Sequence, residues 1–423
     1  MMQSRAEIIA EVLKICNEAK SAAKIMSKLS ESPKNSILKQ VKEAIIINKN
    51  QILKANQIDI ENAHKNGLEA SKIDRLLIDE NKINNIINSI DEIINLPDPV
   101  GKISYNVNRP NGLNIRRIST PIGVMLAIYE SRPNVTADIA SLAIKSGNVV
   151  ILRSGTEAIN SSKILADIFK KVLIENNLPS GAVSFCDNPN RDLIKELLKM
   201  DRFIDVVIPR GGKSLILAIA KHTRIPLFKH LDGNCHTYIH EDADFEKARK
   251  ILFNAKMRRV GICGATESLL VDKKIARKIL PILIDDLIKN GCEVRGDSLS
   301  RQIDKRVQKV TKKDYYQEYL DKILSLKIVS DINEAIDHIA KFGSSHTESI
   351  VTENYESAQQ FLSQVDSAIV MHNASTQFAD GGEFGLGAEV GISTGRLHAR
   401  GPVGLEQLTT YKYQVVAECA IRK

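Results

Sequence analysis

Residues 121–154 read PIGVMLAIYESRPNVTADIASLAIKSGNVVILRS, in which two short apolar runs flank one helical pattern. The runs, Val124–Ile128 and Val149–Leu152, have the length of buried strands, and Val135–Lys145 between them has helical spacing. Two parallel strands need a long crossover connection, which is usually a helix. The stretch therefore predicts an α/β fold built on a parallel sheet.

The alternation of strands and helices continues toward the C-terminus in two blocks. The first block adds a helix at Glu157–Asn176 and strands at Val183–Cys186 and Asp205–Ile208. Asp232-Gly233-Asn234 then predicts a hinge. In the second block we expect strands at Ser268–Val271, Lys327–Val329, Ser349–Thr352 and Ala368–Met371, and helices at Ile275–Asn290, Ile332–Phe342 and Tyr355–Leu362.

The regions on either side have different patterns. Residues 4–96 carry apolar side chains at helical spacing, and the prolines that follow end that region. The Asn111-Gly112 pair lies between extended segments within Tyr105–Ile118, which predicts a protruding β-hairpin ribbon. A glycine-rich stretch at residues 380–404 precedes Leu408–Val416, whose β-prone residues indicate an edge strand.

Composition is typical of a globular protein of two or three domains. The chain has 423 residues, of which 43% are hydrophobic and 26% are charged, which argues against a disordered or fibrous protein. The net charge of +8 suits an anionic ligand or weak attraction to nucleic acid, and it does not distinguish them. No apolar run approaches the ~18 residues of a membrane helix. With 6 cysteines and no CxxC pair, we expect a reduced, cytoplasmic protein.

Cys263 is a candidate nucleophile. It lies close to Lys256, Arg258 and Arg259, and nearby positive charge lowers a thiol pKa and favours the reactive thiolate. Glycines on both sides of the cysteine permit close approach of a substrate. The alternative is a buried structural cysteine, which describes most cysteines and which we expect of Cys186 and Cys292.

Gly211-Gly212 is a candidate phosphate-binding turn. The following Lys-Ser resembles the end of a P-loop, but the first glycine of that motif is replaced by Val207, so we reject a P-loop. The pair still predicts a helix start, where free backbone N–H groups can hold a cofactor phosphate or serve as a plain cap. No GxGxxG motif follows any predicted strand.

His236 and His240 are the one HxxxH pair in the sequence. Thr237-Tyr238-Ile239 between them is typical of a strand, on which four residues span roughly 13 Å, too far for one metal ion. We therefore expect both histidines to be structural, and we predict no metal site.

A set of motifs runs from about Ile118 to Tyr413. It comprises Pro121–Val124, Tyr129–Thr136, Ser146–Asn148, Ile151–Arg153, the Cys263 loop, Asn373–Thr376, Asp380–Gly382, Phe384–Glu389 and His398–Pro402. Together these motifs resemble the gamma-glutamyl phosphate reductase family, within the aldehyde dehydrogenase superfamily. The last four segments are very specific to this reductase family, whereas the first is shared with the wider superfamily.

The resemblance implies an aldehyde-dehydrogenase-like fold with two parallel-sheet domains and a β-ribbon. Residues 1–103 and 121–231 would form the N-terminal helices and the NADP-binding α/β domain, and residues 232–371 the catalytic α/β domain. Residues 104–120 and 405–423 would form an oligomerisation ribbon. Residues 372–404 would return near the active site.

The implied reaction is the reduction of L-glutamyl 5-phosphate by NADPH to glutamate 5-semialdehyde with release of phosphate, the second step of proline synthesis. By resemblance Cys263 attacks the acyl phosphate and forms a thioester. Asn134 and the Cys263 backbone N–H would hold the oxyanion. His230 aligns with the glutamate that activates water in hydrolytic relatives, so the thioester would be protected from hydrolysis.

Other residues have roles implied by the resemblance. Glu318 would hold the nicotinamide ribose, and Arg153 with Ser154 would lie near the adenosine ribose, where Arg153 could meet a 2′-phosphate. The alternative for Glu318 is a solvated helix charge. The basic side chains expected at the substrate phosphate and carboxylate are Lys256, Arg259 and Arg400, since arginine binds such anions bidentately. Many relatives have an asparagine where this chain has Gly264, which affects the positioning of the nucleophile.

Two other functions compete with this interpretation. A hydrolytic aldehyde dehydrogenase would need a general-base glutamate, and in our alignment His230 stands at that position instead. A basic nucleic-acid-binding module has only the +8 charge in its favour, because aromatic residues for stacking bases are only 4%. We expect a homo-oligomer acting on a small molecule, without nucleic acid or membrane, and a transient contact with glutamate 5-kinase that hands over the labile acyl phosphate.

Overall fold

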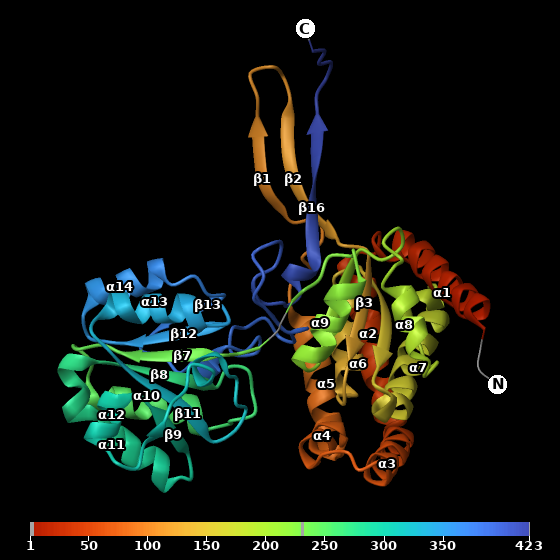
Figure 1. The fold of residues 1–423 in the computed structure, drawn as a ribbon. Helices are drawn as coiled ribbons and strands as arrows, with labels where there is room; N and C mark the ends of the chain where they lie inside the picture. Colours follow the sequence, from red (N-terminus) through yellow and green to blue (C-terminus); the bar gives the residue numbers. More distant parts are fainter. Residues whose placement is uncertain (1–3, 230–231, 423) are drawn as a thin grey trace. The chain divides into compact units, whose positions relative to one another are not determined.

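The computed structural model describes residues 4–229 and 232–422, which form two compact units (Figure 1). Unit 1 comprises Met1–Lys229, Gly385–Gly391 and Val403–Lys423, and unit 2 comprises His230–Phe384 and Ile392–Pro402. The first crossing between them lies within two residues of the predicted hinge. Residues 372–404, predicted to return near the active site, are divided between the two units.

Five helices open unit 1, as the helical spacing predicts. A capping box begins the first helix, because the Ser4 side chain accepts from the Glu7 N–H while Glu7 accepts from the Ser4 N–H. Most of these helices bury an apolar face, for example Ile83, Ile86 and Ile90 in the fifth, whereas the third also buries Asn56 and Asp59. They are α1 (Arg5–Met26), α2 (Glu31–Ile47), α3 (Lys49–Lys65), α4 (Ala70–Leu76) and α5 (Glu80–Asn95).

A four-stranded parallel sheet forms the core of unit 1. Its strands are β3 (Val124–Tyr129), β4 (Val149–Ser154), β5 (Val183–Phe185) and β6 (Val206–Arg210), in the order β5-β4-β3-β6. Helices α6 (Asn134–Lys145), α7 (Ile159–Glu175), α8 (Arg191–Leu197) and α9 (Lys213–His222) connect or follow them. The α/β prediction is confirmed. Because the strand order reverses at β3 and β6, their carboxyl ends form the switch point where α/β sheets bind ligands.

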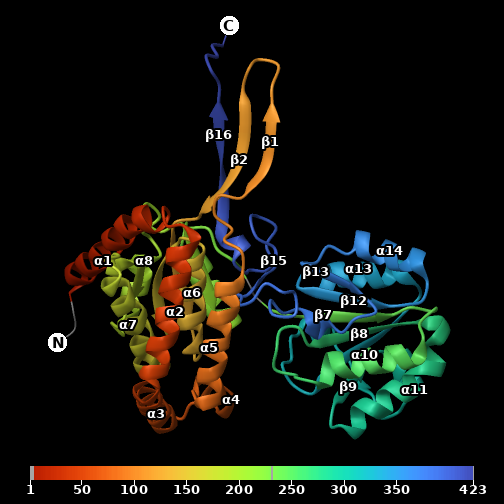
Figure 2. The ribbon, with the colours of Figure 1, turned by 180° about the vertical axis from the view of Figure 1, so that it is seen from behind.

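A three-stranded antiparallel ribbon projects from the rest of unit 1 (Figures 1 and 2). It consists of β1 (Ile103–Asn108), β2 (Asn114–Pro121) and β16 (Thr409–Val416), with β2 in the centre. Gly112 has φ +82° in the turn between β1 and β2, a conformation that glycine adopts without strain. The predicted hairpin and terminal edge strand are both confirmed, and the two come from opposite ends of the chain.

Unit 2 is built on a seven-stranded parallel sheet with helices on both faces. The strand order is β10-β9-β11-β8-β7-β12-β13. The strands are β7 (Cys235–Ile239), β8 (Thr266–Asp272), β9 (Glu293–Gly296), β10 (Gln308–Lys309), β11 (Ile323–Val329), β12 (Thr347–Val351) and β13 (Ile369–His372). The helices are α10 (Phe245–Met257), α11 (Lys273–Lys289), α12 (Ser298–Ile303), α13 (Ile332–Phe342) and α14 (Tyr355–Gln364).

Two apolar clusters hold the layers of unit 2 together. Leu269 and Val271 of β8 pack with α10 and α11, whereas Leu270 between them packs with α13 and α14. Alternate residues of one strand thus face opposite helix layers, as the pleat of a strand requires. The sequence pattern missed α10, which has a charged side chain in most of its turns, and β9, which is only four residues long.

The remaining elements are short. Strands β14 (Ile392–Ser393) and β15 (Gly401–Pro402) pair antiparallel, and five 3₁₀ turns complete the chain: η1 (Thr156–Ala158), η2 (Ser180–Ala182), η3 (Asp314–Tyr316), η4 (Thr376–Phe378) and η5 (Glu406–Leu408). Within residues 4–229 and 232–422, no helix is both long and apolar enough to span a bilayer.

Candidate active site

Cys263 lies in the turn between α10 and β8, partly exposed and packed against a small apolar cluster that includes Met371 and Ala379. The backbone around it is crowded. A Cβ atom on Gly233 would lie 2.0 Å from the Cys263 carbonyl oxygen, and one on Gly264 would lie 3.0 Å from the Thr376 carbonyl oxygen. Glycine at 264 therefore fits the close approach of the 376–379 segment to the nucleophile loop.

The other described cysteines lie in different environments. Burial raises the pKa of Cys16 and Cys186 to about 12, that of Cys292 to about 11, and that of Cys235 well above its ordinary value. The structural role predicted for Cys186 and Cys292 agrees with their burial. The Cys235 thiol donates to the Cys263 carbonyl oxygen at 3.1 Å, so it helps to fix the loop beside the candidate nucleophile.

Asn134 is the first residue of α6 and belongs to unit 1, whereas Cys263 belongs to unit 2. Its Nδ2 donates to Asp138 Oδ2 at 3.0 Å, and Ser89 Oγ donates to the other carboxylate oxygen at 3.2 Å. Burial raises the pKa of Asp138 to about 6, against the effect of these donors. The Asn134 amide is therefore held in one orientation, with a second N–H hydrogen left for another acceptor.

The carboxyl ends of β3 and β6 hold Glu130 and Gly211-Gly212. The Gly212 N–H donates to Glu130 Oε2 at 3.0 Å, and a Cβ on Gly211 would lie 2.7 Å from the same oxygen. The N-terminus of α9 thus already holds a carboxylate, which shows that this end accepts an anion. The helix start that the glycine pair predicts is confirmed.

Arg153 and Ser154 end β4, on the same edge of the sheet. Arg153 is 2% exposed, and its Nη1 donates to the carbonyl oxygens of Ser154 at 3.0 Å and Cys186 at 3.4 Å. Burial lowers its pKa, and its Nε is a buried nitrogen without a hydrogen-bond partner. The guanidinium is turned inward, so the predicted contact with a 2′-phosphate requires a rotamer change.

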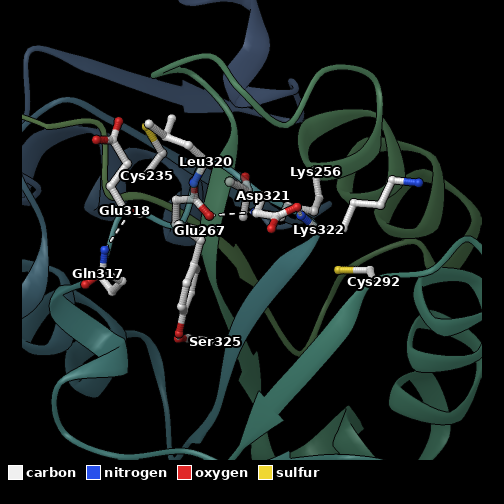
Figure 3. A network of polar contacts seen from close by, with 12 residues as sticks. Cys235, Lys256, Glu267, Cys292, Gln317, Glu318, Leu320, Asp321, Lys322 and Ser325 are labelled. Carbon is white, nitrogen blue, oxygen red and sulfur yellow. Dashed lines mark hydrogen bonds and ion pairs between the residues drawn. The ribbon is translucent and has the colours of Figure 1, made fainter. Parts of the chain in front are cut away.

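Glu318 lies in the loop after η3, not on a helix, which removes the alternative of a solvated helix charge. Its Oε1 accepts from the Gly233 N–H at 2.8 Å. Gly233 also packs against the Cys263 backbone, so Glu318 and Cys263 both contact Gly233. Figure 3 shows Glu318 within a network of polar side chains from the strands and loops around it.

Lys256 is a correction to the expected substrate-binding set. Its side chain is fully buried, and its Nζ lies 2.5 Å from Oε2 of the equally buried Glu267. An ammonium group in this position neutralises a buried carboxylate and does not face a substrate.

The two arginines of that set differ from each other. Arg400 Nη1 donates to Asp366 Oδ1 at 2.6 Å and Nη2 donates to the Asp366 carbonyl oxygen at 3.0 Å, so its charge is already paired. Arg259 lies on the nucleophile loop with an exposed side chain. Arg259, and Arg400 with its side chain 25% exposed, both remain candidates for contact with an anionic substrate.

The histidine pair lies on and beside a strand, as predicted. His236 is in β7 and bonds through both its backbone N–H (2.7 Å) and its Nδ1 (3.0 Å) to the buried Glu348, while His240 Nδ1 lies 3.1 Å from Thr352 Oγ1. Among residues 4–229 and 232–422, no three His, Cys, Asp or Glu side chains are grouped closely enough to hold a metal ion. His230, which aligns with the general base of hydrolytic relatives, lies outside the described residues.

Four carboxylates of this region were not identified from the sequence as contacts of the site: Glu130, Asp138, Glu267 and Asp366. One of them carried a signal, because Glu267 is the one charged residue in the Thr266–Val271 segment, which ends in three apolar residues. A charge in a buried strand needs a partner, and Lys256 lies only 11 residues away. Asp138 lies four residues after Asn134 on the same helix, a spacing that allows their contact, whereas Glu130 and Asp366 contact partners that no local pattern indicates.

Comparison with known proteins identifies the family. The aldehyde dehydrogenase family model matches residues 3–297. The gamma-glutamyl phosphate reductase of Thermoanaerobacter sp. (strain X514) is 48% identical over 406 residues, covering 96% of this chain and 98% of that protein. The chain belongs to the gamma-glutamyl phosphate reductases.

Solved structures of relatives agree with this family. The crystal structure of the gamma-glutamyl phosphate reductase of Thermotoga maritima matches with a TM-score of 0.96 and 42% identity, over 98% of this chain and 100% of that one. An engineered glycolyl-CoA reductase with bound NADP⁺ shares the fold, with a TM-score of 0.68 and 17% identity over 96% of this chain and 97% of that one. The predicted aldehyde-dehydrogenase-like fold of this gamma-glutamyl phosphate reductase family member is therefore confirmed, and the chain is an oxidoreductase.

Proposed function

We propose that this protein reduces L-glutamyl 5-phosphate to L-glutamate 5-semialdehyde with NADPH and releases phosphate. The reaction is the second step of proline synthesis from glutamate. The 48% identity to a gamma-glutamyl phosphate reductase over 96% of the chain carries the proposal. A partly exposed Cys263, with backbone packed closely on both sides, supports it as the nucleophile.

Each step of the mechanism uses residues of this chain. The Cys263 thiolate attacks the acyl carbon, and the negative charge moves to the carbonyl oxygen. The Asn134 amide and the Cys263 backbone N–H stabilise that oxyanion by hydrogen bonds. When the oxyanion collapses, phosphate leaves and a thioester on Cys263 remains. Arg259 neutralises charge on the substrate phosphate or carboxylate.

The cofactor supplies the hydride that reduces the thioester. A nucleotide phosphate would bind at the N-terminus of α9, where Gly211 has no Cβ and the phosphate would replace Glu130 as the acceptor of the Gly212 N–H. Glu318 fits a ribose, since a carboxylate accepts bonds from both hydroxyl groups of the ring. Release of the aldehyde restores the Cys263 thiolate.

The assembly and cellular context complete the proposal. We place the protein in the cytoplasm as a homo-oligomer that pairs through the β1-β2-β16 ribbon. A transient contact with glutamate 5-kinase would shorten the path of the labile acyl phosphate. Exposed Tyr411, Tyr413 and Val415 on the ribbon support a contact between copies.

The reaction is tested most easily in reverse. Purified protein is mixed with glutamate 5-semialdehyde and NADP⁺, with and without phosphate, and NADPH absorbance is followed. We expect NADPH formation to require phosphate and to fall roughly 10³-fold or more in Cys263→Ala. Cys419→Ala, which removes an exposed thiol of the C-terminal segment, serves as the matched control with wild-type rate.

The other outcomes identify a different enzyme. Equal rates without phosphate would mean a hydrolysing dehydrogenase, because water would then resolve the thioester. A folded protein that forms no NADPH under either condition would contradict the proposed reaction. Activity that survives in Cys263→Ala would contradict the thioester mechanism.

A further inference from the structure

The buried ion pair between Lys256 and Glu267 connects two elements of unit 2. Lys256 is in the last turn of α10 and Glu267 is the second residue of β8, and both side chains are fully buried. Two charges leave water at a cost of several kcal/mol each, which the attraction between them offsets only with good geometry and further hydrogen bonds. Such a pair is a poor means of stabilising a core, so its second contacts are informative.

Glu267 uses its other oxygen to hold the loop that carries Glu318. Its Oε1 accepts from the Leu320 backbone N–H at 3.1 Å (Figure 3). Leu320 has φ +54°, a left-handed conformation that is unfavourable for a residue with a Cβ, and its side chain is 39% exposed. The exposed leucine side chain does little to hold this conformation, and the backbone bond to Glu267 is a contact that restrains it.

Tyr319 anchors the same turn from the other side. Its hydroxyl bonds to Asp314 Oδ1 at 3.0 Å and to Ser325 Oγ at 2.8 Å. The Lys256 Nζ lies 6.0 Å from the centre of its ring, within the range of a cation–π contact. The backbone of residues 319 and 320 is thus fixed by Glu267 and by Tyr319, directly after Glu318.

We propose that Glu267, neutralised by Lys256, is a positioning residue that holds the Leu320 backbone and thereby fixes Glu318 for the nicotinamide ribose. The proposal deepens the proposed function and rests on the role given there to Glu318. Glu318 in turn meets the Gly233 N–H and so lies beside the Cys263 loop. The pair therefore acts on cofactor affinity, although neither side chain contacts the cofactor.

The charge state of the pair varies near neutral pH. Burial raises the pKa of Glu267 to about 7, while Lys256 and the Leu320 N–H act to lower it and Glu318 acts to raise it. The other titratable groups nearby, Cys235 and Cys292, have pKa values raised by burial and stay neutral through this range. Protonation of Glu267 below pH 7 removes the charge from the acceptor of the Leu320 bond and weakens it.

The test measures NADPH binding by fluorescence titration without acyl substrate, from pH 6 to pH 9. We expect the wild-type Kd to rise as the pH falls through about 7, and Glu267→Gln to bind roughly tenfold more weakly at pH 8 with a flatter profile. Glu318→Gln should raise the Kd by a similar factor. The double variant should be no weaker than Glu318→Gln alone, because both substitutions act through the same carboxylate.

Two further variants separate positioning from folding. Asp98→Asn leaves another buried lysine, Lys34, without its carboxylate partner in unit 1, so it should lower the melting temperature without changing the pH profile of the Kd. Lys256→Met with Glu267→Leu replaces the pair by apolar side chains, which cores tolerate. It should fold and still bind NADPH several-fold more weakly.

The proposal is overturned if the apolar double variant folds and binds NADPH with wild-type affinity. It is also overturned if Glu318→Gln leaves the Kd unchanged, or if the effects of Glu267→Gln and Glu318→Gln on the Kd simply add. These results differ from those that would contradict the proposed function. The proposed function fails only if the wild-type protein shows no phosphate-dependent NADPH formation in the reverse assay.

Discussion

Asp138 and Glu267 are two carboxylates whose environment disfavours their charge, and each lies beside a residue with a proposed function. Burial raises the pKa of Asp138 to about 6 and that of Glu267 to about 7. Each is held by donors: Asn134 and Ser89 for the first, Lys256 and the Leu320 N–H for the second. The residues that orient Asn134 and Glu318 therefore titrate in or near the physiological range.

Asp138→Asn should stabilise the protein at neutral pH. In the folded protein the pKa of Asp138 is about 6, above its ordinary value of 3.8, so the folded state disfavours the ionised carboxylate. As the pH rises from about 4 through about 6, the carboxyl group ionises and the free energy of unfolding of the wild-type protein decreases. Asparagine does not ionise and avoids that cost. Because the side chain is partly exposed, we expect a gain of about 1–2 kcal/mol at pH 7.5 relative to pH 4.5. Calorimetric melting of both proteins at the two pH values measures it.

The control for this experiment is Asp192→Asn. Asp192 is fully exposed and its pKa is lowered, chiefly by the hydrogen bond from Lys195, so it stays ionised from pH 4.5 to 7.5. Its melting temperature relative to wild type should be the same at both pH values. A stability difference for Asp138→Asn that shrinks as the pH rises would contradict the assignment of a raised pKa.

Gly233→Ala should damage the nucleophile loop. Its methyl group would lie 2.0 Å from the Cys263 carbonyl oxygen, so the backbone of one segment must move. We expect a melting temperature lower by several degrees and a loss of turnover of at least roughly tenfold, since small displacements of a nucleophile are costly. Gly261→Ala is the matched variant for folding, because nothing lies within 4 Å of its added methyl group and its melting temperature should not change.

At the scale of elements, the β-ribbon exposes several large apolar and aromatic side chains. Its two outer strands, β1 and β16, each have one unpaired edge, and most of their side chains are exposed. Tyr411, Tyr413 and Val415 alternate along β16 and so share one face. Exposed strand edges and apolar faces of this kind pair with another chain or aggregate unless they are covered.

Charges on that face should therefore disrupt assembly. We expect Tyr413→Lys with Val415→Lys to reduce the native mass to that of a smaller species in light scattering, with each protomer still folded by circular dichroism. Glu406 and Lys102 form an exposed ion pair at the base of the ribbon. The control is the double variant Lys102→Glu with Glu406→Lys, which exchanges the two charges and should keep the native mass. A wild-type protein that is monomeric, or a variant of unchanged mass, would contradict the oligomerisation role.

At the scale of the whole molecule, the chain passes between the two units at four places, after residues 229, 384, 391 and 402. A ligand that binds only the folded protein raises its stability by RT ln(1 + [L]/Kd). NADPH should therefore stabilise the full chain.

The expected size of this effect is about 2.7 kcal/mol at a cofactor concentration of 100 times Kd. Differential scanning calorimetry of the full chain measures it as a higher melting temperature. Cys263→Ala should keep the increase, because the thiol is not needed for cofactor binding, and Glu318→Gln should reduce it. An equal shift with NADH at the same concentration would argue against a preference for the 2′-phosphate.

The sequence by itself determined most of the longer elements and their order along the chain. The strand–helix alternation that begins at Val124, the hairpin at Asn111-Gly112 and the terminal strand at Thr409–Val416 follow from local periodicity and turn chemistry, and the structure has all three. The motifs between Ile118 and Tyr413, above all those of residues 373–402, also sufficed to indicate the family. These features are local, because hydrophobic period and backbone conformation are set within a few residues.

Tertiary structure decided which charged side chains are free to meet a ligand. The sequence predicts Lys256 as a substrate contact, and the fold instead buries it against Glu267, 11 residues away. Arg400, also predicted, pairs with Asp366, 34 residues away, and stays partly exposed. Glu130 reaches the Gly212 N–H across 82 residues. Periodicity shows which face of an element is apolar, but the partner of a charge depends on which elements the sheet order brings together, and that order is not encoded in any single segment.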